Sequence, residues 1–215
     1  MSSDATATVR QTLAGPAGAI EILVDTPPGT PAGIAIIAHP HPLEGGNAEH
    51  KIPQGIAKAC QRNGWLAVRP NFRGVGASAG VHDAGEGETL DLLAVADALQ
   101  AEHPGLPLIL AGFSFGAYVQ TRVAALIAAR GGAVDRVILV GTPVGTVRAH
   151  RHYDTPPPPD HALVIHGEAD EIASVEPVLA WARPQKVPVV VLPGANHFLT
   201  GHMHRLLELV ERHLK

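Results

Sequence analysis

The feature that most constrains this chain is a serine between two glycines, at a point where the hydrophobic pattern changes. An apolar run, 106–112, leads into Gly112-Phe-Ser-Phe-Gly116, and an amphipathic stretch, 115–130, follows. A continuous apolar run is typical of a buried strand, and apolar residues spaced by three and four indicate a helix. The glycines favour a tight turn, because a Cβ atom at either position would crowd the backbone. The pattern therefore predicts a strand, a sharp turn that exposes Ser114, and a helix.

Strands and helices are expected to alternate along the rest of the chain. Two short runs, 9–13 and 19–24, flank a Gly-Pro-Ala-Gly turn and predict an antiparallel hairpin at a sheet edge. The other expected strands are 33–38, 65–69, 136–140, 162–166 and 187–192, and the other expected helices are 53–63, 89–102, 174–183 and one that includes Met203 to Leu214. This alternation predicts an α/β fold, with a mostly parallel sheet of seven or eight strands and helices on both faces. The proline-rich segment 141–161 is expected to be an extended loop, too short for a lid domain.

Size and charge limit the possible partners. The 215 residues, 46% of them hydrophobic, suffice for one sizeable core, so residues 1–215 are expected to form a single domain. The net charge of −4 and the scattered Lys and Arg argue against a face for nucleic acid or for an anionic membrane. No signal peptide, membrane span or internal disulfide is expected, since the N-terminus is polar and Cys60 is the only cysteine. We expect a cytoplasmic protein, monomer or homodimer, that acts on a small molecule.

A serine hydroxyl needs a nearby base, and that base needs a carboxylate to orient it, before the serine becomes a nucleophile. In a sheet of this kind, functional groups collect beyond the carboxyl ends of the parallel strands. One predicted strand runs into His166-Gly-Glu-Ala-Asp170, and another runs into Pro193-Gly-Ala-Asn-His197. The residues expected to be catalytic are therefore Ser114 as nucleophile, His197 as base and Asp170 as orienting acid.

Simpler interpretations of the same three residues remain open. Ser114 could serve only as a helix N-cap, and His197 could be a histidine of a surface loop. Glu168 and Glu171 compete with Asp170 for the role of the acid, because they lie in the same loop.

Several motifs together resemble one family. The order Ser, Asp, His along the chain is that of the α/β-hydrolases. His166-Gly-Glu-Ala-Asp170, Gly194-Ala-Asn-His197-Phe and Asn71-Phe-Arg-Gly-Val-Gly76 are similar to segments of that superfamily. With His39-Pro-His-Pro-Leu-Glu-Gly-Gly46, they make the chain resemble the small, lidless, dienelactone-hydrolase-like esterases of bacteria from about residue 20 to the end. The resemblance implies an α/β-hydrolase fold without a lid domain, and a serine hydrolase that cleaves carboxylic esters, with thioesters as a further possibility, through an acyl-enzyme.

The turn and the resemblance each suggest one donor for an oxyanion hole. The turn directs the backbone N–H of Phe115 toward the developing charge. The resemblance implies a second donor after the strand 33–38, where His39-Pro40 replaces the family's usual His-Gly. We expect the N–H of His41 to serve, because Pro42 has none, with Leu43 in reserve. Phe113, Phe198 and Leu43 are expected to line the substrate site.

Two other functions remain open. Histidine pairs at 39/41, 150/152 and 202/204 have a spacing that metals use, so a metal-dependent hydrolase is the first alternative. The pair at 202 and 204 is expected on a helix, where such residues diverge. The second alternative is a non-catalytic binding module that kept the pocket. We expect no cofactor and no metal. Because the dienelactone hydrolases proper have a cysteine where this chain has Ser114, their substrate cannot be transferred to it.

Overall fold

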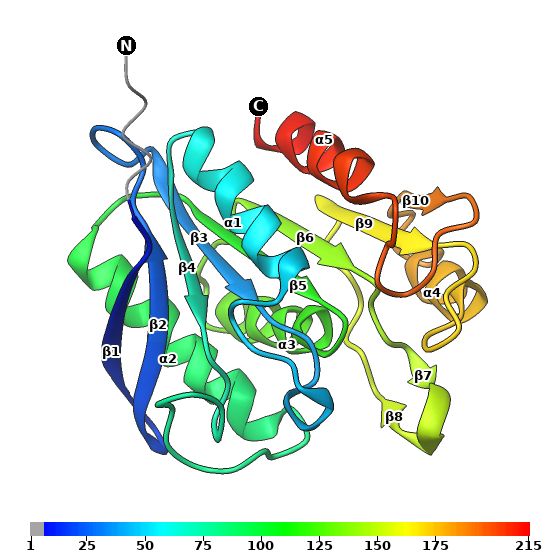
Figure 1. Ribbon diagram of the computed structural model, residues 1–215, viewed down its shortest axis with the longest axis horizontal. Helices are drawn as coiled ribbons and strands as arrows, with labels where there is room; N and C mark the ends of the chain where they lie inside the picture. The colour runs from blue at the N-terminus through cyan, green and yellow to red at the C-terminus, as the bar shows by residue number, and fades with distance from the viewer. Residues whose placement is uncertain (1–6) are drawn as a thin grey trace.

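The computed structural model describes residues 7–215, and its centre is an eight-stranded sheet with the strand order β1-β2-β4-β3-β5-β6-β9-β10 (Figure 1). The strands β4, β3, β5, β6, β9 and β10 run parallel, whereas β1 and β2 form an antiparallel hairpin at one edge. The strand bounds are β1 Val9–Gly15, β2 Gly18–Asp25, β3 Gly33–Ala38, β4 Trp65–Pro70, β5 Leu108–Phe113, β6 Arg136–Val140, β9 Ala162–Gly167 and β10 Val189–Leu192.

Helices cover both faces of the sheet because each central strand is apolar on both sides. In β3, Ile34, Ile36 and Ala38 belong to one buried cluster, and Ala35 and Ile37 belong to another. The first cluster includes residues of α2 (Glu86–Glu102), α3 (Phe115–Ala129) and α4 (Val175–Ala182). The second includes residues of α1 (Lys51–Arg62) and α5 (Met203–Leu214) (Figure 1). The predicted α/β fold with a mostly parallel sheet is confirmed.

Two predictions of local structure need correction. The segment 141–161 is not wholly an extended loop, because Gly145–Thr146 (β7) and His152–Tyr153 (β8) pair as a short antiparallel ribbon. The second predicted helix begins at Glu86 rather than at residue 89. Its first turn, Glu-Gly-Glu, has no apolar periodicity, and the Glu88 carboxylate stabilises this turn by accepting the Gly85 N–H at 2.9 Å.

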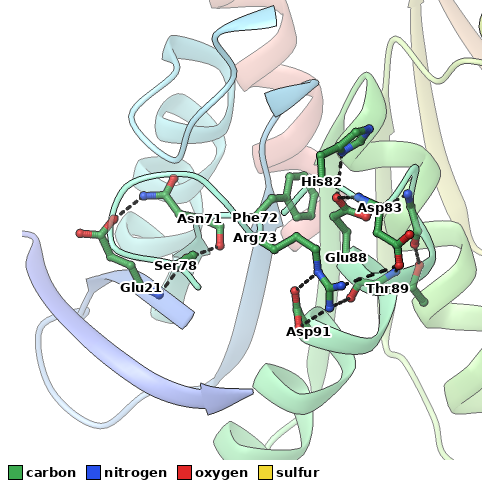
Figure 2. A network of polar contacts seen from close by, with 12 residues as sticks. Glu21, Asn71, Phe72, Arg73, Ser78, His82, Asp83, Glu88, Thr89 and Asp91 are labelled. Atoms are coloured by element: carbon green, nitrogen blue, oxygen red, sulfur yellow. Dashed lines mark hydrogen bonds and ion pairs between the residues drawn. The ribbon is translucent and has the colours of Figure 1, made fainter. Parts of the chain in front are cut away.

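The long connection 71–85, between β4 and α2, is held by side chains rather than by regular structure (Figure 2). The Asn71 amide bonds the carboxylate of Glu21 in β2, and Ser78 Oγ bonds the carbonyl of Asn71 at 2.8 Å. Arg73 pairs with Asp91 of α2 at 2.8 Å, which raises the pKa of its guanidinium. The segment 71–76 is therefore a structural turn, and Arg73 points into this network.

Within the part of the chain that the structure describes, no helix combines the length and the apolar character that crossing a membrane requires.

Candidate active site

Ser114 stands at a strained turn between β5 and α3. Its φ of 55° and ψ of −123° are uncommon for a residue with a side chain, and such strain is stabilised only by dense packing around it. A Cβ atom on Gly112 would lie 2.4 Å from the backbone of Gly116, and one on Gly116 would lie 2.4 Å from Ala38 O. Glycine is thus required at both positions, because the turn packs directly against the end of β3.

His197 lies between Ser114 and Asp170. Its Nε2 is 2.9 Å from Ser114 Oγ, and its Nδ1 is 2.7 Å from Asp170 Oδ2. Ser114 is partly exposed, whereas His197 and Asp170 are buried. The three residues come from loops that follow β5, β9 and β10, and these are the loops in which the sequence predicted them. An imidazole placed between a hydroxyl and a carboxylate in this way can take a proton from the hydroxyl.

Asp170 is fixed by its own loop. Its Oδ1 accepts N–H bonds from Ile172 at 2.9 Å and Ala173 at 2.8 Å. Burial alone raises the pKa of the Asp170 carboxyl, but hydrogen bonds from His166 and His197 outweigh burial and hold that pKa far below the usual range. Asp170 is therefore ionised at neutral pH, as a partner for an imidazolium must be.

The two competing acids bind the backbone of the His197 loop instead of its ring. Glu168 accepts the N–H of Gly194 at 2.9 Å, and Glu171 accepts the N–H of His197 at 3.3 Å. Both glutamates position the loop, and Asp170 alone of the three contacts the imidazole.

His166 is a site residue to which sequence reasoning gave no role. It is fully buried, and its Nε2 lies 2.7 Å from Ala173 O and 3.3 Å from Asp170 Oδ2. Because a carbonyl oxygen can only accept, Nε2 must carry the proton, which also faces the carboxylate. The signal for His166 was present in the motif His166-Gly-Glu-Ala-Asp170, where an i, i+4 pair spans the end of the strand.

The two expected oxyanion donors are both free to bind a ligand. No acceptor within residues 7–215 takes the N–H of Phe115 or of His41. The reserve donor, Leu43, is excluded, because its N–H bonds His41 Nδ1 at 3.3 Å. His39 fixes this loop: its Nδ1 donates to Pro40 O at 2.7 Å, and its Nε2 accepts the N–H of Phe72 at 3.0 Å.

A cleft of about 170 Å³ opens at Ser114 and His197. Phe198, with 40% of its surface exposed, lines it as expected. Phe113 does not, and this prediction is wrong: the ring is fully buried and packs behind His197, with 5.1 Å between ring centroids. Leu43 does not line this cleft; its exposed side chain lines a second hollow beside it. Residues of the cleft that sequence reasoning missed include Glu44, His50, Arg151 and Tyr153.

The histidine pairs that suggested a metal do not form a metal centre. Both ring nitrogens of His39 are already used by the protein backbone. Among residues 7–215, no three His, Cys, Asp or Glu side chains are grouped so that they could hold an ion. His204 follows in α5, one residue into the helix, so it diverges from His202 as expected.

Comparisons with known proteins identify relatives of this chain in sequence and in fold. Residues 41–157, more than half of the chain, match the family described as serine aminopeptidase, S33. An uncharacterised protein of Rickettsia prowazekii is 32% identical over 192 residues, which is 86% of this chain and 79% of that protein. The crystal structure of a Xanthomonas campestris α/β serine hydrolase without a lid is 34% identical, with a TM-score of 0.85, and the match covers 97% of this chain and 94% of that one. An α/β serine hydrolase homologue from Coxiella burnetii is 35% identical, with a TM-score of 0.81, over 96% and 97% of the two chains.

Proposed function

The chain belongs to the α/β-hydrolase superfamily, as a serine hydrolase, and from that membership we propose that it cleaves carboxylic esters with Ser114, His197 and Asp170 as its catalytic triad. One observation carries the proposal. A single imidazole bridges the strained serine at 2.9 Å and a buried carboxylate at 2.7 Å. Neither an N-cap serine nor a surface histidine requires this arrangement.

The reaction proceeds in two halves. Ser114 Oγ attacks the ester carbonyl while its proton moves to His197 Nε2, and Asp170 stabilises the resulting imidazolium. The C–O bond of the ester breaks, the proton on Nε2 goes to the leaving alcohol, and an acyl-enzyme remains. Water then gives a proton to Nε2 and attacks the acyl carbon. The acid leaves, and the proton returns to Ser114 Oγ.

The backbone N–H groups of Phe115 and His41 would bind the oxyanion in both halves. Both are unpaired in residues 7–215 and both belong to segments that meet at Gly116. Loss of one such donor typically lowers the rate by about 10²–10³.

Esters are proposed over peptides because, among the residues within 7–215 that line the cleft, no unpaired carboxylate is present for an N-terminal ammonium. Its acid, Glu44, pairs with Arg151 at 2.9 Å. The substrate would be a small ester, or a thioester, and no metal or organic cofactor takes part. The free thiol of Cys60, whose pKa is raised to about 12 by burial, is unreactive and fits a protein that acts in the reducing cytoplasm.

A fluorophosphonate probe tests the nucleophile directly. The wild type is expected to be labelled and Ser114→Ala is not, with ester turnover reduced by several orders of magnitude. Ser174→Ala, at the exposed start of α4, is the matched control and keeps both properties. Acyl p-nitroanilides beside p-nitrophenyl esters and thioesters of the same acids measure the preference among amide, ester and thioester. Undiminished turnover in Ser114→Ala, or activity lost to a chelator and restored by Zn²⁺, would contradict the proposal.

A further inference from the structure

A second hollow, of about 280 Å³, lies beside the cleft that contains Ser114. The two share three lining residues: His41, Arg151 and Tyr153. The rings of Phe115 and Tyr153 form aromatic walls of the second hollow, with their centroids 6.3 Å apart. A cavity of about 150 Å³ already holds benzene. One half of an ester bound at Ser114 can therefore extend into this hollow as an aryl group.

His82 lines the second hollow and is oriented by a buried acid. Its Nδ1 lies 2.8 Å from Glu88 Oε1, and Glu88 is fully buried in α2 (Figure 2). The Glu88 carboxylate also accepts N–H bonds from Asp83 and Gly85, so it acts only as an acceptor. Nδ1 of His82 therefore carries a proton toward Glu88, and in the ring with a single proton Nε2 is the acceptor.

His41 lies next to His82 and offers a hydrogen-bond donor where His82 offers an acceptor. Its ring centroid is 4.8 Å from that of His82, and its Nδ1 accepts the N–H of Leu43. The remaining proton is therefore on Nε2, which donates. Burial, reinforced by Arg151 and His82, lowers the pKa of His41 to about 4, so the ring is neutral at pH 7. Neither Nε2 has a partner within residues 7–215, and neither is among the buried unpartnered atoms, so both are accessible, on rings that line the hollow.

One donor and one acceptor side by side match a hydroxyl group, which accepts and donates at once. On the basis of the proposed ester hydrolysis, we propose that the substrate is a hydroxyaryl ester, whose ring occupies the second hollow and whose hydroxyl binds between His41 Nε2–H and His82 Nε2. His82 is then a specificity residue: it positions the aryl ring of the substrate and takes no part in the proton transfers at Ser114.

The experiment compares pairs of esters that differ only in the hydroxyl. Phenyl acetate is paired with its 3- and 4-hydroxy derivatives, and methyl benzoate with its 3- and 4-hydroxy derivatives, so that either side of the ester can carry the ring. The measured quantity is the ratio of kcat/KM within a pair, divided by the same ratio for a variant, which cancels intrinsic reactivity. For at least one pair, loss of the hydroxyl contact is expected to change this ratio by about tenfold, as for one hydrogen bond.

Two substitutions of His82 separate its contact with the substrate hydroxyl from its contact with Glu88. His82→Asn places an amide N–H near the position of Nδ1, so Glu88 keeps its partner while nothing replaces Nε2. His82→Gln reaches the position of Nε2 but loses the contact with Glu88. The hydroxyl preference should disappear in His82→Asn and persist in His82→Gln. The same substitutions at His204, which is exposed on α5, are the controls and should leave it unchanged.

Any other pattern in the two His82 variants overturns the inference, as does a wild type that shows no preference in any pair. If either variant fails to fold, His41→Asn decides: its Oδ1 can accept the Leu43 N–H, it lacks the Nε2 donor, and a retained preference refutes the proposal. Failure of the ester hydrolysis itself is recognised separately, because the wild type would then not be labelled by the fluorophosphonate probe.

Discussion

Replacement of Asp170 by asparagine should inactivate the enzyme through the tautomer of His197. The oxygen of the new amide must occupy the position of Oδ1, because two N–H groups, those of Ile172 and Ala173, point at it from 2.9 and 2.8 Å. The NH₂ group is thereby forced into the position of Oδ2 and donates to His197 Nδ1. The histidine then carries its proton on Nε2, facing Ser114, and cannot accept the hydroxyl proton.

The expected loss in kcat is about 10⁴, the size seen when a triad aspartate is amidated elsewhere, and this corresponds to ~5.5 kcal/mol of transition-state stabilisation. The amide also meets a second donor. His166 Nε2, 3.3 Å from Oδ2, must keep its proton for Ala173 O. Two facing donors should lower the free energy of unfolding by about 1–3 kcal/mol. Ester turnover and thermal unfolding, measured on the same preparation, report the two effects separately.

Glu168→Gln and Glu171→Gln are matched controls, because both glutamates accept only backbone N–H groups and glutamine retains an accepting oxygen. Their turnover should stay within a few-fold of the wild type. The reasoning is refuted if Asp170→Asn keeps its turnover within tenfold of the wild type, or if either control falls as far as Asp170→Asn does.

Two more outcomes are expected. Gly116→Ala should lower the melting temperature and abolish turnover, since its Cβ would lie 2.4 Å from Ala38 O and 2.5 Å from His39 O. The control Gly55→Ala should do neither, because its Cβ would meet only the flexible ends of Met203 and Leu207. Equal melting temperatures for the two variants would contradict this prediction. Burial lowers the pKa of His39 to about 3, below the ~6.5 of the unfolded chain. As the pH falls, the unfolded state therefore binds the proton first. The stability that is present above pH 6.5 is lost as the pH falls toward 3. Between pH 6.5 and 5, the free energy of unfolding of the wild type should fall by about 1.6 kcal/mol more than that of His39→Gln, measured by denaturant titration, and parallel slopes would exclude the effect.

The sheet could be predicted because its strands have a simple pattern. The segments 33–38 and 137–140 are apolar without alternation, and the structure covers both of their faces with helices. Helix starts were harder to predict. The first turn of α2 has no apolar residue, and its stability comes from the Glu88 side chain, which periodicity does not reveal. The ribbon of β7 and β8 has two residues in each strand, too few for any alternation.

The burial of Phe113 could have been predicted from the alternation of side chains along β5. Residues 109, 111 and 113 alternate along β5, and all three side chains belong to the cluster under α1 and α5. Continuing the period of two up to the serine would have placed Phe113 in the core. Phe115 starts the helix instead and belongs to the opposite cluster, where its ring reaches the second hollow.

The proposed chemistry and the proposed specificity depend on different kinds of sequence information. Ser114 directly follows β5, and Asp170 and His197 lie in the loops after β9 and β10, so the order of the strands along the chain was enough to bring them together. His82 lies within the connection 71–85, whose path depends on Asn71 with Glu21 and on Arg73 with Asp91. No periodicity encodes such pairings, and each joins residues far apart in the sequence. The reaction type therefore follows from short motifs, whereas the substrate depends on loop conformations that only the three-dimensional structure provides.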